Sequence, residues 1–311
     1  MNILITSSGR RVELVQLVKE YVKKYNGQVI AADASNNAPT SKFCDIFKQI
    51  PRISSPDFIP SLLEICKEHK IDILIPTIDT ELKILAENVD KFSAMGVLVN
   101  ISSSTVIEIC RNKINTQHFF EENNILAPSF IPPNVSSESV KYPVFIKPLD
   151  GSSSINAFKV NTAKELDFFR SYVPNPIVQE MIMGEEFTVD VFCDFNSKPI
   201  TIVPRRRLAV RSGEILKGKT IRDYSIIKAS IDLVEKLKPF GHITLQCIKN
   251  ENGIYFIEIN PRFGGGAPMS IVAGANSIEN LIKLKKGEKL SYNEDWKDNI
   301  IFSRFDNSVI I

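Results

Sequence analysis

The chain has 311 residues, a length typical of about two domains. Hydrophobic residues make up 43% and charged residues 24%, which excludes a disordered or collagen-like chain. Lys and Arg number 38 against 36 Asp and Glu, so the net charge of +2 argues against a dedicated nucleic-acid or membrane-surface binder. Five scattered cysteines, no signal-peptide pattern and no long apolar run predict a cytoplasmic protein with reduced thiols and no membrane span.

The N-terminal third alternates short apolar strands with amphipathic helices. The expected strands are 3–6, 29–32, 71–76 and 97–99, and the expected helices are 12–22, 58–69 and 81–92. Continuous apolar strands separated by helices predict an α/β unit with a parallel sheet covered on both faces.

The turn after the first strand reads Ser8-Gly9-Arg10-Arg11. It has one of the three glycines that a dinucleotide site needs, which disfavours a nicotinamide dehydrogenase. We interpret Ser8 as the N-cap of the following helix. An anion bound at the start of that helix remains open.

A second unit begins near Glu108, where strands follow one another at hairpin spacing. This pattern predicts an α+β unit with antiparallel sheets and divides the chain into domains 1–108 and 109–311, with a small subdomain at about 118–180. The expected strands are 144–147, 157–160, 177–180, 187–193, 200–204, 243–248 and 254–259, and the expected helices are 113–123, 163–172, 225–237 and 278–285.

Two segments of the second unit suit a nucleotide. Lys147 ends an apolar strand and precedes a loop of small residues, whose N–H groups and hydroxyls can donate to phosphate oxygens; a plain turn is an equal alternative. The segment 177–187 is expected to be a strand, a short connector and a second strand, and the connector can offer backbone groups to a flat base while nearby carboxylates accept from ribose hydroxyls. Taken alone, it reads better as a surface edge with solvated glutamates.

The hairpin from Ile243 to Arg262 carries the strongest signal. Alternation places Glu258 and Asn260 on one face of its second strand, and a loop of four or five residues would set Gln246 opposite or diagonal to Glu258. Converging oxygen ligands without thiolate or imidazole fit Mg²⁺ or Mn²⁺. The alternative is a strand with a polar outer face; the clean alternation with Ile257 and Ile259 favours a site.

This constellation resembles the ATP-grasp superfamily, and within it the branch of carbamoyl phosphate synthase and the pyrrolysine-pathway amino-acid ligase. The resemblance covers nearly the whole chain and implies a pre-ATP-grasp α/β domain followed by an ATP-grasp fold. The chain is far shorter than carbamoyl phosphate synthase, so it resembles one module of that enzyme. Gln246 replaces the more common acid at the first metal position, which removes one negative charge.

The resemblance assigns roles residue by residue. It implies that Lys113 and Lys147 contact the nucleotide phosphates, that Glu186, with Glu180 close by, binds the ribose, and that Arg262 steadies the transferred phosphoryl group. The phosphate loop corresponds to Gly151, Ser152, Ser153 and Ser154, the adenine hinge to Gln179, Glu180, Met181 and Ile182, and the metal ligands to Gln246, Glu258 and Asn260.

Substrate recognition must come from other residues. Arg205 and Arg207 share a strand face and suit a carboxylate or phosphate, with a solvated basic edge as the equal alternative. Gly265, within three glycines after Arg262, allows close approach to the reacting groups. Asp79 and Glu81 follow a strand end in the first domain and are candidates for holding an amine.

The resemblance implies an ATP-dependent carboxylate–amine ligase. A substrate carboxylate becomes an acylphosphate, an amine attacks it, and an amide, ADP and phosphate result. The expected partners are small carboxylates and amines such as amino acids, without nucleic acid or membrane, and a homodimer is left open. The alternatives are a non-catalytic ATP-binding sensor or scaffold, and a phosphotransferase that needs no amine.

Overall fold

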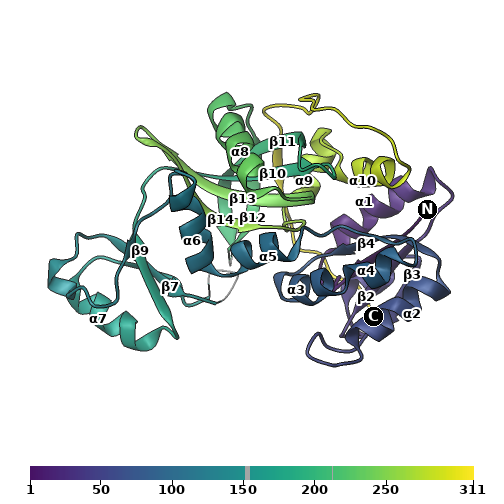
Figure 1. The fold of residues 1–311 in the computed structure, drawn as a ribbon, viewed down its shortest axis with the longest axis horizontal. Helices are drawn as coiled ribbons and strands as arrows, with labels where there is room; N and C mark the ends of the chain where they lie inside the picture. Colours follow the sequence, from purple (N-terminus) through teal and green to yellow (C-terminus); the bar gives the residue numbers. More distant parts are fainter. Residues whose placement is uncertain (151–154, 212) are drawn as a thin grey trace.

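A computed structural model describes residues 1–150, 155–211 and 213–311. Three sheets lie in a row, with the N-terminal parallel sheet at one end, a large antiparallel sheet in the middle and a small antiparallel sheet at the other end (Figure 1). The expected fold class, a parallel α/β unit followed by antiparallel sheets, is confirmed. Within the described ranges, no helix has the length and apolar character needed to cross a bilayer.

The N-terminal sheet has the strand order β3-β2-β1-β4-β5, and all its pairs are parallel. Its strands are β1 (Asn2–Thr6), β2 (Val29–Asp33), β3 (Ile46–Gln49), β4 (Ile71–Pro76) and β5 (Leu98–Val99). The helices around it are α1 (Val12–Lys23), the 3₁₀ turn η1 (Pro39–Lys42), α2 (Phe58–Glu68), α3 (Asp79–Glu87), α4 (Val89–Ser93) and α5 (Ser104–Arg111).

Alternation along β1 builds two hydrophobic cores on opposite faces of this sheet. Leu4 faces α2 and α3 in one core, whereas Ile3 and Ile5 face α1 in the other. The second core also takes up buried residues from the C-terminal half, among them Phe263 and Ile278. The N-terminal unit therefore shares one core with the second unit.

The central sheet has the order β14-β13-β10-β11-β12-β15 and is antiparallel throughout. One of its faces packs against α8 and α6 in a large core, and the opposite face carries the polar side chains described below. Its elements are β10 (Glu185–Cys193), β11 (Pro199–Arg211), β12 (Glu214–Thr220), β13 (Gly241–Asn250), β14 (Gly253–Asn260), β15 (Ile301–Ser303), α6 (Lys113–Glu122), α8 (Tyr224–Leu237), α9 (Ala267–Ala273) and α10 (Ser277–Lys285).

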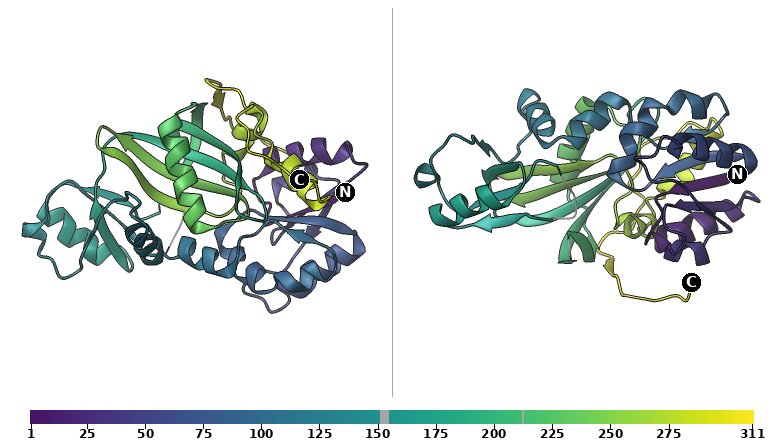
Figure 2. Two further views of the ribbon diagram at one scale, coloured as in Figure 1. Left: turned by 45° about the horizontal axis from the view of Figure 1, so that its top comes forward. Right: turned by 90° about the horizontal axis from the view of Figure 1, so that it is seen from below.

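The small sheet has the order β6-β9-β7-β8 and projects away from the other two (Figures 1 and 2). Its own core contains Val144, Ile146 and Leu166, and α7 covers it. Its elements are β6 (Phe130–Ile131), the 3₁₀ turn η2 (Ser137–Ser139), β7 (Val144–Pro148), β8 (Phe158–Val160), α7 (Ala163–Tyr172) and β9 (Pro176–Glu180).

The fold differs from the expectation at several points. The strands β3, β6, β12 and β15 and the helices α5 and α9 were not predicted from the pattern. The prediction that Ser8 caps α1 is wrong: the N-cap is Arg11, and Ser8 Oγ is hydrogen-bonded to Thr40 Oγ1 at 2.8 Å. Residue 108, the expected domain boundary, falls inside α5, which contributes Val106 to one core and Ile107 to another.

Candidate active site

A cavity of about 990 Å³ lies where all three sheets meet, and most of the expected site residues line it. Among them are Asp79, Lys113, Lys147, Glu180, Met181, Ile182, Glu186, Arg205, Arg207, Gln246, Glu258, Asn260, Arg262 and Gly265. Glu81 is absent from this lining, and the expected phosphate loop, Gly151–Ser154, lies outside the described residues. The sequence thus brings distant segments to one cavity, while the individual roles remain predictions.

Two lysines mark one end of the cavity. Lys147 stands on β7, and Lys113 is the first residue of α6, where its Nζ donates to the carbonyl oxygen of Leu149 at 2.9 Å. Burial lowers the pKa of Lys147 to about 8, although the nearby Glu258 carboxylate raises it. Glu258 offsets only part of the cost of burying the positive charge of Lys147, so an anionic ligand would stabilise the charged lysine. This part of the cavity therefore fits nucleotide phosphates.

The edge expected to bind adenine and ribose joins β9 to β10. Met181 and Ile182 line the cavity there. Glu180 Oε1 accepts a hydrogen bond from the backbone N–H of Ser129 at 3.0 Å, whereas Glu186 lies 3.3 Å from Arg207 Nε. The Glu186 side chain is 39% exposed, which leaves its carboxylate accessible to a ribose hydroxyl.

The hairpin of β13 and β14 brings three oxygen-bearing side chains together. Gln246 pairs directly with Glu258, and Thr244 pairs with Asn260. The expected loop of four or five residues is wrong, because only two residues separate the strands. Ile257 is instead the extra residue of a β-bulge, since Cys247 pairs with Phe256, and this bulge keeps Glu258 opposite Gln246.

Glu258 is the single carboxylate of this oxygen set. The amide oxygen of Gln246 accepts from Arg207 Nη1 at 3.3 Å, and that of Asn260 accepts from Arg262 Nη2 at 3.1 Å. No cluster of three or more His, Cys, Asp or Glu side chains suited to a metal occurs in residues 1–150, 155–211 and 213–311. One carboxylate with neutral oxygens fits a magnesium-like ion that completes its shell with phosphate and water.

Asp79 and Glu81, expected to hold an amine substrate, both have hydrogen-bond partners within the protein. Asp79 binds Arg262 through both oxygens, with Nε–Oδ1 at 2.9 Å and Nη2–Oδ2 at 2.5 Å. Glu81 is fully buried and accepts from the backbone N–H groups of Thr77 and Ile78 at the start of α3. Glu81 is buried outside the cavity lining, so its expected contact with an amine substrate is wrong, whereas that of Asp79, which lines the cavity and binds Arg262, stays a prediction.

Arg205 is likewise held by the protein itself. Its Nε and Nη2 lie 2.9 Å and 2.8 Å from Asp190 Oδ2, and both side chains are almost fully buried. Burial alone would raise the pKa of Asp190, but Arg205, His242 and Ser270 hold it well below its ordinary value. Arg205 therefore lines the cavity as half of a buried ion pair, which excludes the alternative of a solvated basic edge for this residue, while its expected role in holding a carboxylate or phosphate stays a prediction.

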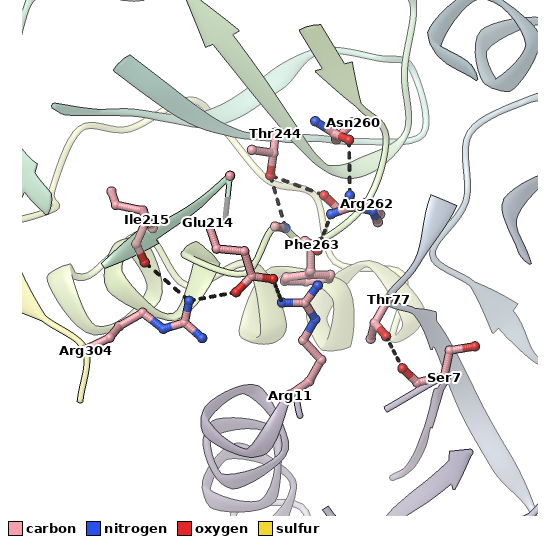
Figure 3. Close-up of polar contacts among 12 residues, drawn as sticks. Ser7, Arg11, Thr77, Glu214, Ile215, Thr244, Asn260, Arg262, Phe263 and Arg304 are labelled. Carbon is pink, nitrogen blue, oxygen red and sulfur yellow. Dashed lines mark hydrogen bonds and ion pairs between the residues drawn. The ribbon is translucent and has the colours of Figure 1, made fainter. Parts of the chain in front are cut away.

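A group of charged residues that no sequence motif indicated also borders the cavity. Arg11 reaches from the start of α1 to Glu214 on β12, and Arg304 binds the same carboxylate (Figure 3). The signal available in the sequence was the Arg10-Arg11 pair directly after the first strand, at the helix start where an anion had been left open. Nothing in the sequence indicates that residue 214 returns to that helix.

Family models cover most of the chain. An "ATP-grasp domain" model matches residues 110–266, and a "PylC-like, N-terminal domain" model matches residues 3–100. The D-alanine–D-alanine ligase of Fusobacterium nucleatum is 25% identical over 55% of this chain and 60% of its own length, so the alignment spans less than two thirds of that ligase. The 3-methyl-D-ornithine–L-lysine ligase of Methanosarcina acetivorans is 25% identical over 84% of this chain and 68% of its own length.

Solved structures share the fold at low sequence identity. Biotin carboxylase from Campylobacter jejuni superposes with a TM-score of 0.75 at 16% identity, covering 96% of this chain and 74% of that one. An L-amino acid ligase from Bacillus licheniformis gives a TM-score of 0.70 at 18% identity, covering 94% of this chain and 75% of that one. With the ATP-grasp model matched over half of its length, the chain belongs to the ATP-grasp family, as the sequence predicted.

Proposed function

We propose that the protein is an ATP-dependent ligase that joins a carboxylate to an amine. The γ-phosphoryl group of ATP passes to the substrate carboxylate, which gives an acylphosphate and ADP. The amine then forms the carbon–nitrogen bond as phosphate leaves and a proton is lost. ATP-grasp family membership and the two matched relatives named as ligases support this reaction.

The observation that carries the proposal is that these groups share one cavity. Its lining contains the two lysines, the Gln246, Glu258 and Asn260 oxygens, and Arg262, which lies two residues beyond the end of β14. Glu258 is close enough to Lys147 to raise the pKa of its amine. Negative charge develops on the transferred phosphoryl group and its neighbours during such a reaction. Cationic side chains and a bound metal ion in the same cavity would stabilise that negative charge.

Each residue acts through its own chemistry in this proposal. Lys113 and Lys147 hold nucleotide phosphates, and Glu186 accepts from the ribose. Glu258, with the amide oxygens of Gln246 and Asn260, would hold Mg²⁺, which supplies charge neutralisation on the phosphates when bound. Arg262, oriented by Asp79 on one side and Asn260 on the other, donates to the transferring group.

The proposal extends to partners and location. We expect small carboxylates and amines, amino acids among them, and a cytoplasmic setting in keeping with the scattered cysteines. The expectation of a homodimer stays open.

The test is ADP release from ATP and Mg²⁺ across a matrix of amino acids, singly and in pairs, with product masses measured in active wells. Activity that needs a carboxylate and an amine together, with an amide-sized product, is the expected result. ADP release without an amine would identify a phosphotransferase. ATP binding without ADP release in any well would favour the sensor.

A further inference from the structure

Arg11 connects the N-terminal unit to the central sheet at the end of the cavity away from the lysines. Its Nη1 lies 3.1 Å from Glu214 Oε1, a contact between residues 203 positions apart in the chain. Figure 3 shows the Arg11 side chain rising from the start of α1 toward Glu214, with Arg304 approaching the same carboxylate from another side. Arg11 lines the cavity beside Arg262 and Gly265.

Arg11 shares its acidic partner with a second arginine. Glu214 is shared by two guanidinium groups, because Arg304 Nη1 lies 3.0 Å from its Oε2. The neighbouring acid Asp79 is bound by Arg262, and Asp190 is bound by Arg205. The residues outside the described ranges are glycine and serine, so they add no acid. Glu13 lies near Arg304 and offsets part of the charge of that arginine, whereas the acid in contact with Arg11 among the described residues is the shared Glu214.

The Arg11 guanidinium is mostly shielded from bulk water. The Arg11 side chain is 21% exposed, and burial, together with Arg262 and Arg304, lowers the pKa of its guanidinium despite Glu214. Among the described residues, Nη1 is the only atom of this guanidinium with an acceptor, so its other N–H groups are available to a ligand.

A glycine makes room for this arrangement. A Cβ atom on Gly265 would lie 2.7 Å from Arg11 Nη1 and 3.1 Å from the Glu214 carboxylate, so a larger residue would displace the guanidinium. Gly266 makes room for a second arginine in the same way, since a Cβ atom on Gly266 would lie 2.5 Å from Arg205 Nη1. The glycine turn thus admits guanidinium groups to the cavity wall.

Resting on the proposed function, we propose that Arg11 binds a carboxylate that one substrate keeps throughout the reaction, distinct from the carboxylate that is activated. A guanidinium with N–H groups not used by the described residues can bind a carboxylate through two parallel hydrogen bonds. The substrate class is accordingly an acid with a second functional group that reacts, as in an amino acid that reacts through its amine or side chain. Arg11 is then the specificity residue that the N-terminal unit supplies.

Two variants separate recognition from a merely structural ion pair. Arg11→Gln and Glu214→Gln both break the same pair, so a structural role predicts equal effects. Recognition predicts opposite effects: Arg11→Gln raises the KM of the acid about tenfold to a hundredfold, whereas Glu214→Gln keeps or lowers it. Arg10→Gln changes the adjacent, exposed arginine and serves as the matched control, with parent values expected.

The measurement compares amino acids with their carboxamides, which lack the negative charge. We expect the parent protein to prefer the acid and Arg11→Gln to lose that preference, with the KM for ATP unchanged within about twofold. An unchanged preference in Arg11→Gln, or equal effects of Arg11→Gln and Glu214→Gln, would overturn the proposal.

Calorimetric binding of the same acids and carboxamides in the presence of ADP and Mg²⁺ distinguishes this proposal from the ligase reaction. Binding that depends on Arg11 without any turnover supports the carboxylate site and contradicts the ligase. Turnover without a preference for the acid supports the ligase and contradicts the site. Failure of every acid in the panel to bind also contradicts the site.

Discussion

Glu258 carries the only negative charge in the oxygen set of β13 and β14. Replacing it with the isosteric Gln keeps the shape and removes the charge that a divalent ion needs, so we expect Glu258→Gln to lower ADP release at least about a hundredfold. Glu251→Gln, in the exposed turn of the same hairpin, is the control. Thermal unfolding checks that both variants fold. Near-parent activity of Glu258→Gln would remove the metal-site assignment.

Lys147 has a pKa of about 8 in the folded protein, below its ordinary value of 10.5. Phosphate binding favours the protonated amine, so nucleotide affinity is expected to fall as the pH rises above about 8. The stability of the free protein is expected to show the opposite trend. The unfolded state binds more protons between the two pKa values, so the contribution of Lys147 to the free energy of unfolding should rise with pH across that window. Titration of ADP from about pH 7 to pH 10 tests this.

Lys147→Arg supplies the matched comparison for that titration. The guanidinium stays charged over the whole range, so the part of the pH dependence that comes from residue 147 should disappear. An equally steep loss of ADP affinity in Lys147→Arg would assign the effect to another group.

Asp79 binds Arg262, so under the proposed function we expect it to be a positioning residue that acts through that arginine. Asp79→Asn keeps the size of the side chain but weakens the two-pronged ion pair, so Arg262 loses its fixed orientation. We expect kcat to fall about tenfold or more while the KM for ATP changes little. Asp232→Asn, exposed on α8, should leave both constants unchanged. A rise in the KM for ATP alone would contradict this role.

At the scale of elements, two ion pairs link β10 to β11, one of them buried and the other exposed. Asp190 and Arg205 are 2% and 1% exposed, whereas Glu185 and Arg206 are 51% and 42% exposed. Asp190→Asn leaves a buried guanidinium without its counter-charge, and we expect a loss of about 3 kcal/mol or more in the free energy of unfolding. Glu185→Gln should cost less than about 1 kcal/mol. Urea denaturation measures both, and equal losses would contradict the difference in burial.

The hairpin illustrates how far the sequence determines the site. Alternation along 254–260 was enough to place Glu258 and Asn260 together and Gln246 opposite, because side-chain direction in a strand has a fixed period. The bulge at Ile257 was not predictable from the sequence. A longer turn and an extra residue within the strand both shift which residues of β13 and β14 pair, so the pattern cannot distinguish them. The alternation therefore predicted the pairing of Gln246 with Glu258 correctly, although the predicted length of the turn was wrong.

Contacts between distant segments account for most of what the sequence did not predict. The dipeptide after the first strand marked Arg11, but its partner Glu214 lies on a strand that the pattern analysis missed. Asp79 and Arg205 were singled out as charged residues near strand ends, yet their partners were unknown, so both were assigned to a substrate. Motif spacing indicates which side chains are unusual, and the tertiary fold decides which of them pair with each other.

At the scale of the whole molecule, one core joins the N-terminal unit to the C-terminal half. Ile278 on α10 is fully buried in the core that contains Ile5 and Val15. Ile278→Ala should therefore lower the unfolding temperature of the molecule as a whole, with a cost of about 2–5 kcal/mol. Val272→Ala, on the exposed side of α9, is the control. Calorimetry that showed two transitions, with only one shifted, would contradict the shared core.

The small sheet stands apart from that arrangement because it has a core of its own. Lys147 stands on this sheet, whereas Arg11 and Glu214 stand on the N-terminal unit and the central sheet. A displacement of the small sheet would change the cavity around Lys147 and leave those two residues in place. Under the proposed function, we therefore expect nucleotide exchange and the choice of the other substrate to depend on separate parts of the chain. Replacing the small sheet with that of another family member should therefore alter nucleotide exchange. The substrate preference should stay that of this chain, which still supplies the N-terminal unit and the central sheet.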